Sequence, residues 1–116
     1  MAVKFKTSAP QVLLDKFNAA IDQTEAKGKI TTWVRDSAGD FTHKADDWNQ
    51  LAWMCPKIEQ GQLRFTILHP TGKTIKTVTY AYYHGHLIET FLAHFDSYFT
   101  DAIATALIET GDSVAP

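Results

Sequence analysis

The chain of 116 residues has little cysteine: Cys55 is the only one. A single thiol cannot close an internal disulfide, and disulfides are typical of secreted proteins. The sequence also has no Asn-x-Ser/Thr triplet, the acceptor for N-linked glycans. These two absences favour a protein of the cytoplasm.

Long hydrophobic runs are missing as well. No window approaches the roughly 20 apolar residues of a membrane span, and Met1–Lys6 alternates apolar with basic residues instead of forming the apolar core of a signal peptide. An excess of one charge is also lacking, since 11 Lys and Arg stand against 13 Asp and Glu for a net charge of −2. We therefore expect neither a membrane nor a nucleic acid as a partner.

What the sequence does contain is the composition of one packed domain. It is 45% hydrophobic and 21% charged, with only six Gly and four Pro. These values exclude disordered, collagen-like and coiled-coil proteins. No linker or internal repeat divides the chain, so the sequence predicts a single domain over 1–116, with flexible ends at 1–8 and 111–116.

Hydrophobic spacing predicts a sheet with a helix before it and another after it. The first helix is expected over Pro10–Lys27, with Ser8 as its cap. Period-two patterns predict strands at Lys29–Arg35, Phe41–Lys44, Leu63–His69 and Thr74–Tyr83, and Ala45–Gln60 reads as a short helical turn that leads into a strand. The predicted fold class is α+β: an antiparallel meander of four to five strands, flanked by an N-terminal helix and a long C-terminal helix packed on one face.

The segment from His86 to Thr110 has no Gly or Pro and predicts one long C-terminal helix. Its apolar arc spans about 160°, whereas about 100° is typical of a helix that lies on a sheet. This excess predicts a second surface to pack against. The first helix, a small ligand or another subunit could supply it, and we expect a homodimer or another protein as the partner.

Aromatic residues and histidines gather where the last predicted strand passes into this helix. Such junctions often hold sites, because a strand end is rigid and a helix N-terminus offers free N–H groups. A half-buried His94 could act there as a general base or as a pH-sensitive contact. The candidates for contact with a ligand or partner are Tyr80, Tyr82, His84, His86, Phe91, His94 and Tyr98.

Catalytic and cofactor motifs are absent. Neither a nucleophile elbow nor a dinucleotide-binding glycine pattern occurs, and Cys55 has the apolar neighbours typical of a structural thiol. His84 and His86 could begin a metal site, but neither a Cys cluster nor a His-Glu-x-x-His motif completes it. We therefore predict no cofactor and no metal, and we leave open whether the chain is an enzyme.

The triplet Gly72-Lys73-Thr74 is similar to the end of a phosphate-binding loop. That loop needs a glycine where Ile67 stands, and it needs a helix after Thr74, where a strand is expected. The triplet is therefore predicted to be a hairpin turn.

The sequence thus predicts a small cytoplasmic binding or adaptor module that acts through protein association, as a homodimer, with the C-terminal helix as its contact surface. The alternative is a small-molecule-binding protein or an enzyme, with a pocket between the sheet and that helix lined by the tyrosines and histidines named above. No motif specifies the biological process.

Overall fold

A computed structural model describes all residues, 1–116. Its elements follow in the order β1 (Val3–Lys6), α1 (Pro10–Asp22), β2 (Trp33–Arg35), β3 (Phe41–His43), β4 (Trp53–Glu59), β5 (Gln62–Leu68), α2 (Thr77–Phe95), the 3-10 helix η1 (Asp96–Tyr98) and β6 (Asp101–Ala104). The predicted α+β class is confirmed, with six strands in place of four or five.

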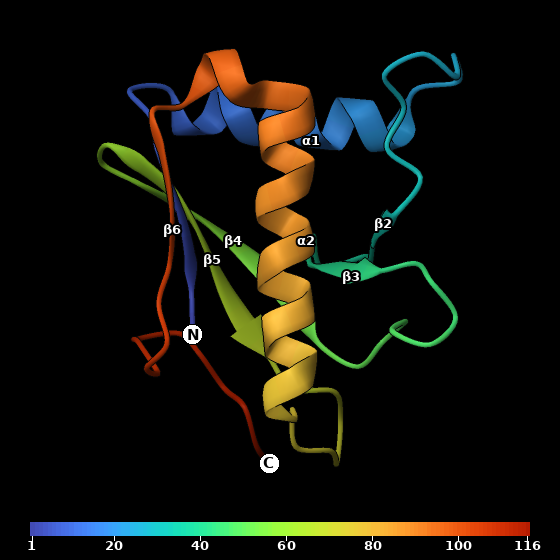
Figure 1. The fold of residues 1–116 in the computed structure, drawn as a ribbon, viewed down its shortest axis with the longest axis vertical. Coiled ribbons are helices and arrows are strands. Elements are labelled where there is room, and N and C mark those ends of the chain that lie inside the picture. The colour runs from blue at the N-terminus through green and yellow to red at the C-terminus, as the bar shows by residue number, and fades with distance from the viewer.

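The strands form one antiparallel sheet in the order β2-β3-β4-β5-β1-β6. Strands β2 to β5 are a meander, as predicted, because each pairs with the next strand in sequence. Strands β1 and β6 continue the sheet beyond β5, so segments from the two ends of the chain lie side by side (Figure 1). The edges of the sheet are β2 and β6.

Both helices cover the same face of the sheet, as predicted, and α1 lies crosswise to α2 (Figure 1). Phe17 of α1 and Phe91 of α2 both contact Phe65 of β5. Phe91 also stacks on Phe5 of β1, with ring centroids 4.1 Å apart. The core is therefore an aromatic cluster between the sheet and the two crossing helices.

The N-terminal segment is an interior strand, so the prediction of a flexible end at 1–8 is wrong there. Val3 and Phe5 are fully buried, and β1 is hydrogen-bonded to β5 on one side and to β6 on the other. The alternation of apolar and basic residues in Met1–Lys6 is the period-two pattern of this strand.

The C-terminal end is also fixed by backbone hydrogen bonds, in contrast to the predicted flexibility of 111–116. The N–H of Ser113 donates to the carbonyl of Ile67, and the carbonyl of Ser113 accepts from His69. The carbonyl of Val114 accepts from Ile75. These bonds hold the segment beside the end of β5 and the start of α2.

Helix α1 begins at Pro10, as predicted, but it ends at Asp22 rather than Lys27. Its N-cap residue is Ala9, so Ser8 does not cap it. The Nζ of Lys29 folds back and donates to the carbonyls of Ile21 and Gln23. These bonds satisfy carbonyls that the last turn leaves free.

Glycine residues form the tight turns between β2 and β3 and between β4 and β5. The strands β4 and β5 join at a turn in which Gly61 has a φ of +79°, and Gly39 has a φ of +89° in the turn before β3. Glycine adopts this left-handed backbone without steric cost. Within Ala45–Gln60 a turn leads into β4, as expected.

The largest correction concerns Thr74–Tyr83, which is predicted to be a strand and instead leads into the first half of α2. The segment is rich in Thr, Val and Tyr, which favour strands. Helical spacing of the apolar residues outweighs this propensity, and Gly85 lies inside the helix rather than breaking it. A buried residue recurs at every fourth position through Ile75, Thr79, Tyr83, Leu87, Phe91 and Phe95.

The predicted helix over His86–Thr110 is correspondingly wrong after Phe95. The chain turns in η1, and β6 then pairs with β1, placing Ala102 opposite Phe5. Strand β6 supplies hydrogen-bond partners to the backbone N–H and C=O groups on the side of β1 that faces away from β5. Without β6 these groups would be unpaired, which is unfavourable. The predicted apolar arc was too wide in part because residues that belong to strand β6 were counted as if they were helical.

Candidate functional site

The predicted contact residues all lie on α2 or in η1, but they do not form one surface. Helix α2 has neighbours on both sides, so residues close in sequence separate around its circumference. Phe91 points into the core and is fully buried. The other six form three pairs: Tyr82 and His86 toward β3, Tyr80 and His84 toward β6, and His94 and Tyr98 toward α1.

Tyr82 and His86 belong to an aromatic stack that fixes the loop before β4. The indole of Trp48 lies on the Tyr82 ring, with centroids 3.8 Å apart and planes 7° apart. His86 also stacks on Tyr82, with centroids 4.1 Å apart. Because the tyrosine lies between these two rings, neither of its faces is open to a ligand.

His43 of β3 closes this stack from the side. Its ring lies edge-on to His86, with centroids 5.0 Å apart, and it is 3% exposed. The N–H of Ala45 donates to Nδ1, so the proton of the neutral ring lies on Nε2, which is buried without a partner. Burial, and then the proximity of His86, lower the pKa of His43, so this imidazole is neutral at neutral pH.

Tyr80 and His84 line a groove of about 290 Å³ between α2 and the chain that leaves β6. Figure 1 shows these two parts of the fold running alongside each other. Most of the lining side chains are small, which leaves room for another backbone to approach closely. We call this site the α2 groove, and it is lined by Tyr80, Ala81, His84, Gly85, Ile88, Ala104, Thr105 and Ala106.

His84 is buried in the wall of the α2 groove, and its ring nitrogens have no hydrogen-bond partner. It is 4% exposed, and neither ring nitrogen makes a hydrogen bond. Burial lowers the pKa of His84, and the Met1 carbonyl, which is near the ring but not in hydrogen-bond geometry, opposes this effect. The amino group of Met1 lowers the pKa further, and the carboxylate of Asp112 raises it. A buried polar group without a partner costs about 1–3 kcal/mol, so packing alone does not account for a histidine here.

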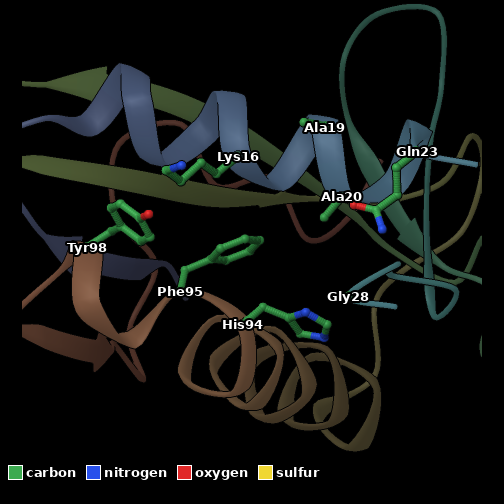
Figure 2. A pocket seen from close by; sticks show the side chains of 8 residues that line it. All are labelled: Lys16, Ala19, Ala20, Gln23, Gly28, His94, Phe95 and Tyr98. Carbon is green, nitrogen blue, oxygen red and sulfur yellow. The ribbon is translucent and has the colours of Figure 1, made fainter. Parts of the chain in front are cut away.

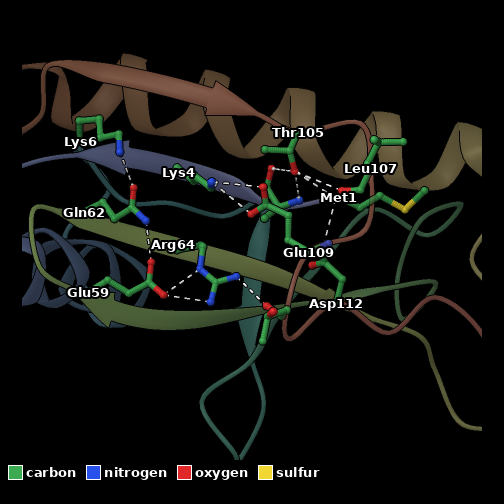
Figure 3. Close-up of polar contacts among 12 residues, drawn as sticks. Met1, Lys4, Lys6, Glu59, Gln62, Arg64, Thr105, Leu107, Glu109 and Asp112 are labelled. Carbon is green, nitrogen blue, oxygen red and sulfur yellow. Dashed lines mark hydrogen bonds and ion pairs between the residues drawn. The ribbon is translucent and has the colours of Figure 1, made fainter.

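The wall of the α2 groove opposite the helix is held by polar contacts (Figure 3). The hydroxyl of Thr105 accepts the N–H of Ala2, and Lys4 pairs with Glu109 at 3.2 Å. The fully buried carboxylate of Asp112 accepts the N–H of Ile67. These long-range contacts hold 105–112 against β1 and β5.

The outer face of α2, turned away from the sheet, carries an exposed apolar stripe. Val78 is 62% exposed and Leu92 is 50% exposed. Glu89 is the only Asp, Glu, Lys or Arg within α2. The apolar stripe comprises Val78, Ala81, Gly85, Ile88 and Leu92, and three of these residues also line the α2 groove.

No contact or backbone conformation within the chain requires a glycine at position 85. Its φ is not positive, and a Cβ atom built on it would meet nothing within 4 Å. Glycine inside a helix costs about 1 kcal/mol relative to alanine. The residue therefore destabilises α2 without a compensating contact in the chain.

The apolar stripe could not be predicted as one face, because Val78 and Ala81 fall within the predicted strand Thr74–Tyr83. The signal was present in the spacing of Val78, Ala81 and Gly85, which are three and four positions apart. The composition of Thr74–Tyr83 concealed it.

The third pair, His94 and Tyr98, lines a cavity of about 310 Å³ between α1 and the end of α2 (Figure 2). Lys16 of α1 places its Nζ 4.4 Å from the centre of the Tyr98 ring, a cation–π contact. The Nε2 of Gln23 already donates to the carbonyls of Glu25 and Lys27. His94 is exposed rather than half-buried as predicted.

Nucleophilic and metal chemistry find little support in this geometry. Burial, and then Asp40, raise the pKa of the Cys55 thiol, which keeps it protonated and weakly nucleophilic. The structure has no group of three or more His, Cys, Asp or Glu side chains placed to hold a metal ion.

Comparison of the chain with protein-family models, with curated proteins and with solved structures finds no match. Neither helix combines the length and the apolar composition of a membrane-spanning helix. The function therefore has to be argued from the geometry described above.

Proposed function

We propose that this protein is an association module that forms a two-fold homodimer through the apolar stripe of α2. Gly85 carries the proposal: it is exposed in the middle of a helix, it costs helix stability, and it contacts nothing around its Cβ position. A glycine at this position lets a second backbone approach closely. The partner that we infer is a second copy of α2.

The two ends of the apolar stripe are symmetric about Gly85. Val78 lies seven residues before it and Leu92 lies seven residues after it. At 1.5 Å per residue, each is about 10 Å from the glycine along the helix axis. Two antiparallel copies that cross at Gly85 would therefore place Leu92 of each copy on Val78 of the other. A two-fold interface needs this kind of self-complementarity.

Glu89 favours the antiparallel arrangement over the parallel one. It lies four residues after Gly85, on the same side of α2 as the apolar stripe. In a parallel pair the two Glu89 carboxylates would face each other, and like charges repel. In an antiparallel pair each Glu89 faces Ala81 of the partner, and the two helix dipoles oppose each other favourably.

The α2 groove supports the same interface. Its small side chains at 104–106 lie beside Ala81 and Gly85, and they would form a second wall for the incoming helix. Leu107 and Ile108 follow this wall and are 81% and 58% exposed. Large apolar side chains clustered at an edge are typical of a contact surface.

The small-molecule alternative has weaker support. Its best site is the cavity of Figure 2, where Lys16 already contacts Tyr98 and Gln23 is hydrogen-bonded within its own loop. A cytoplasmic setting belongs to the association proposal, and the lone Cys55 thiol supports it.

Cysteine cross-linking tests the proposed geometry. Val78→Cys and Leu92→Cys are made separately in a Cys55→Ser background and oxidised alone or as an equal mixture. In an antiparallel dimer the new thiols face each other only between the two variants, so the mixture should give far more covalent dimer than either protein alone. Equal cross-linking in all three samples would contradict the arrangement.

Sedimentation equilibrium tests whether the apolar stripe is the interface. Leu92→Glu should shift the protein to monomer by burying a charge in the contact. Val12→Glu is the matched control, because Val12 is 48% exposed on α1, away from the apolar stripe. A wild-type chain that stays monomeric, or a control that dissociates as readily as Leu92→Glu, would refute the proposal.

A further inference from the structure

Two adjoining hollows lie at the N-terminal end of α2, at the opposite end of the helix from the cavity of Figure 2. The first has a volume of about 250 Å³ and is lined by Leu51, Pro70, Lys73, Thr74, Lys76 and Thr79. The second, of about 480 Å³, shares Leu51, Pro70 and Lys73 with the first and adds Asn49, Gln50, Trp53 and Thr71. Neither is lined by an acidic residue.

The first hollow is positively charged. Lys73 and Lys76 are exposed, and neither takes part in an ion pair. The N-terminus of α2 adds a partial positive charge from the helix dipole. The first hollow is thus lined by two unpaired lysines and lies at a helix N-terminus. The chain as a whole has a net charge of −2.

Backbone donors are also free at this point. The N-cap residue of α2 is Lys76, and no side chain caps the helix. The N–H groups of Thr77 and Val78 therefore have no acceptor within the helix. Anions bind at helix N-termini by accepting such N–H groups.

Thr79 gives an independent sign of a ligand. It is only 5% exposed, its hydroxyl makes no hydrogen bond within the chain, and it lines the first hollow. The hydroxyl oxygen is accessible from the hollow rather than sealed in the core. An oxygen atom of a ligand in the hollow would supply its missing hydrogen-bond partner.

The structure also changes the interpretation of Gly72-Lys73-Thr74. A helix follows this triplet closely, where the sequence predicts a strand. Ile67 still stands where a phosphate-binding loop has glycine. The hollow is therefore not that loop, but it presents a lysine and a helix N-terminus in a comparable way.

We propose that the first hollow binds the phosphoryl group of a small anionic ligand. Its donors are the two lysine ammonium groups, the N–H groups of Thr77 and Val78, and the hydroxyl of Thr79. So many donors suit the several oxygens of a tetrahedral dianion better than the two of a carboxylate. The second hollow, with Leu51 and Trp53 in its wall, accommodates the group that carries the phosphoryl.

Titration followed by amide NMR tests this site. Inorganic phosphate and phenyl phosphate are added separately to the full chain at constant ionic strength. Saturable shifts of the amides of Thr77, Val78 and Thr79 are expected. Tighter binding of phenyl phosphate assigns an esterified ligand that reaches the second hollow, and equal affinities assign free phosphate. The absence of saturable shifts with both probes would overturn the proposal.

Variants separate a built site from general charge attraction. The double variant Lys73→Gln, Lys76→Gln should bind at least about tenfold more weakly. Its control is Lys27→Gln, Lys44→Gln, which removes the same charge at exposed positions outside both hollows. Thr79→Val should weaken binding while the melting temperature stays equal or rises. Equal weakening in both double variants, or unchanged binding in Thr79→Val, would overturn the site.

Discussion

The hydroxyl groups of Thr42 and Tyr83 lie 3.0 Å apart inside the core. Thr42 also accepts the backbone N–H of Gln50, and Tyr83 donates to the carbonyl of Trp48. Gln50 is the only residue other than glycine with a positive φ, at +61°. The two hydroxyls thus tie the loop before β4 to α2 and hold its one strained residue in place.

Thr42→Val should destabilise the fold by about 2 kcal/mol, because it leaves the Gln50 N–H and the Tyr83 hydroxyl short of a partner. Thr66→Val is the matched control: Thr66 is also fully buried, but its hydroxyl has no hydrogen-bond partner. That change should be neutral or stabilising. Urea denaturation measures both variants, and equal losses of unfolding free energy would contradict the assignment of Thr42 as an anchor.

Gly85 and Gly111 should respond in opposite ways to alanine. Gly111 has a φ of +98°, and an added Cβ would lie 2.9 Å from the Cγ2 of Thr66, so Gly111→Ala should cost at least about 2 kcal/mol. Gly85→Ala should raise the stability of the monomer by about 1 kcal/mol, since its surroundings are open.

The same Gly85→Ala variant should weaken the proposed dimer, because the methyl group separates the two helices. Thermal unfolding at low protein concentration and sedimentation at high concentration measure the two effects independently. A gain in monomer stability together with unchanged association would show that the interface lies elsewhere.

Stability should fall as the pH drops below about 6.5, the ordinary pKa of histidine. Burial lowers the pKa of both His43 and His84 in the folded chain. The unfolded chain therefore takes up protons first as the pH falls, and stability is lost between the unfolded and the folded pKa. The charged groups that act on His84 are Asp112 and the amino group of Met1.

His84→Gln should flatten this dependence as the pH falls below about 6.5, because glutamine does not titrate. His94→Gln is the control, an exposed histidine on the same helix. Urea denaturation across this pH range measures the slope. An unchanged slope in His84→Gln would mean that the buried ring is not the source of the effect.

Sequence reasoning succeeded where a local signal decides the structure. Pro10 marks the start of α1, and the spacing of the apolar residues gives the α+β class. It failed for Thr74–Tyr83, where the β-branched and aromatic residues favour a strand. The helical spacing there runs on to Phe95, and it is clear only when the whole stretch is taken together.

The candidate sites were harder to predict than the elements. Tyr82 was named from the sequence, but its partner Trp48 lies in a distant loop. Gly72-Lys73-Thr74 was interpreted as a hairpin turn, in part because a strand was predicted where α2 follows. Gly85 fell between the predicted strand Thr74–Tyr83 and the predicted helix His86–Thr110, so its exposed position inside a helix was not anticipated.

By itself the sequence determined the class of the fold, the turns and the start of the first helix, because glycine, proline and short-range spacing restrict the backbone locally. Only the tertiary structure decided that Val3–Lys6 and Asp101–Ala104 pair at one side of the sheet. Strand pairing joins residues about 100 positions apart, and no local pattern encodes such a partner. The same long-range packing turned α2 so that Gly85 faces outward and His84 faces the groove.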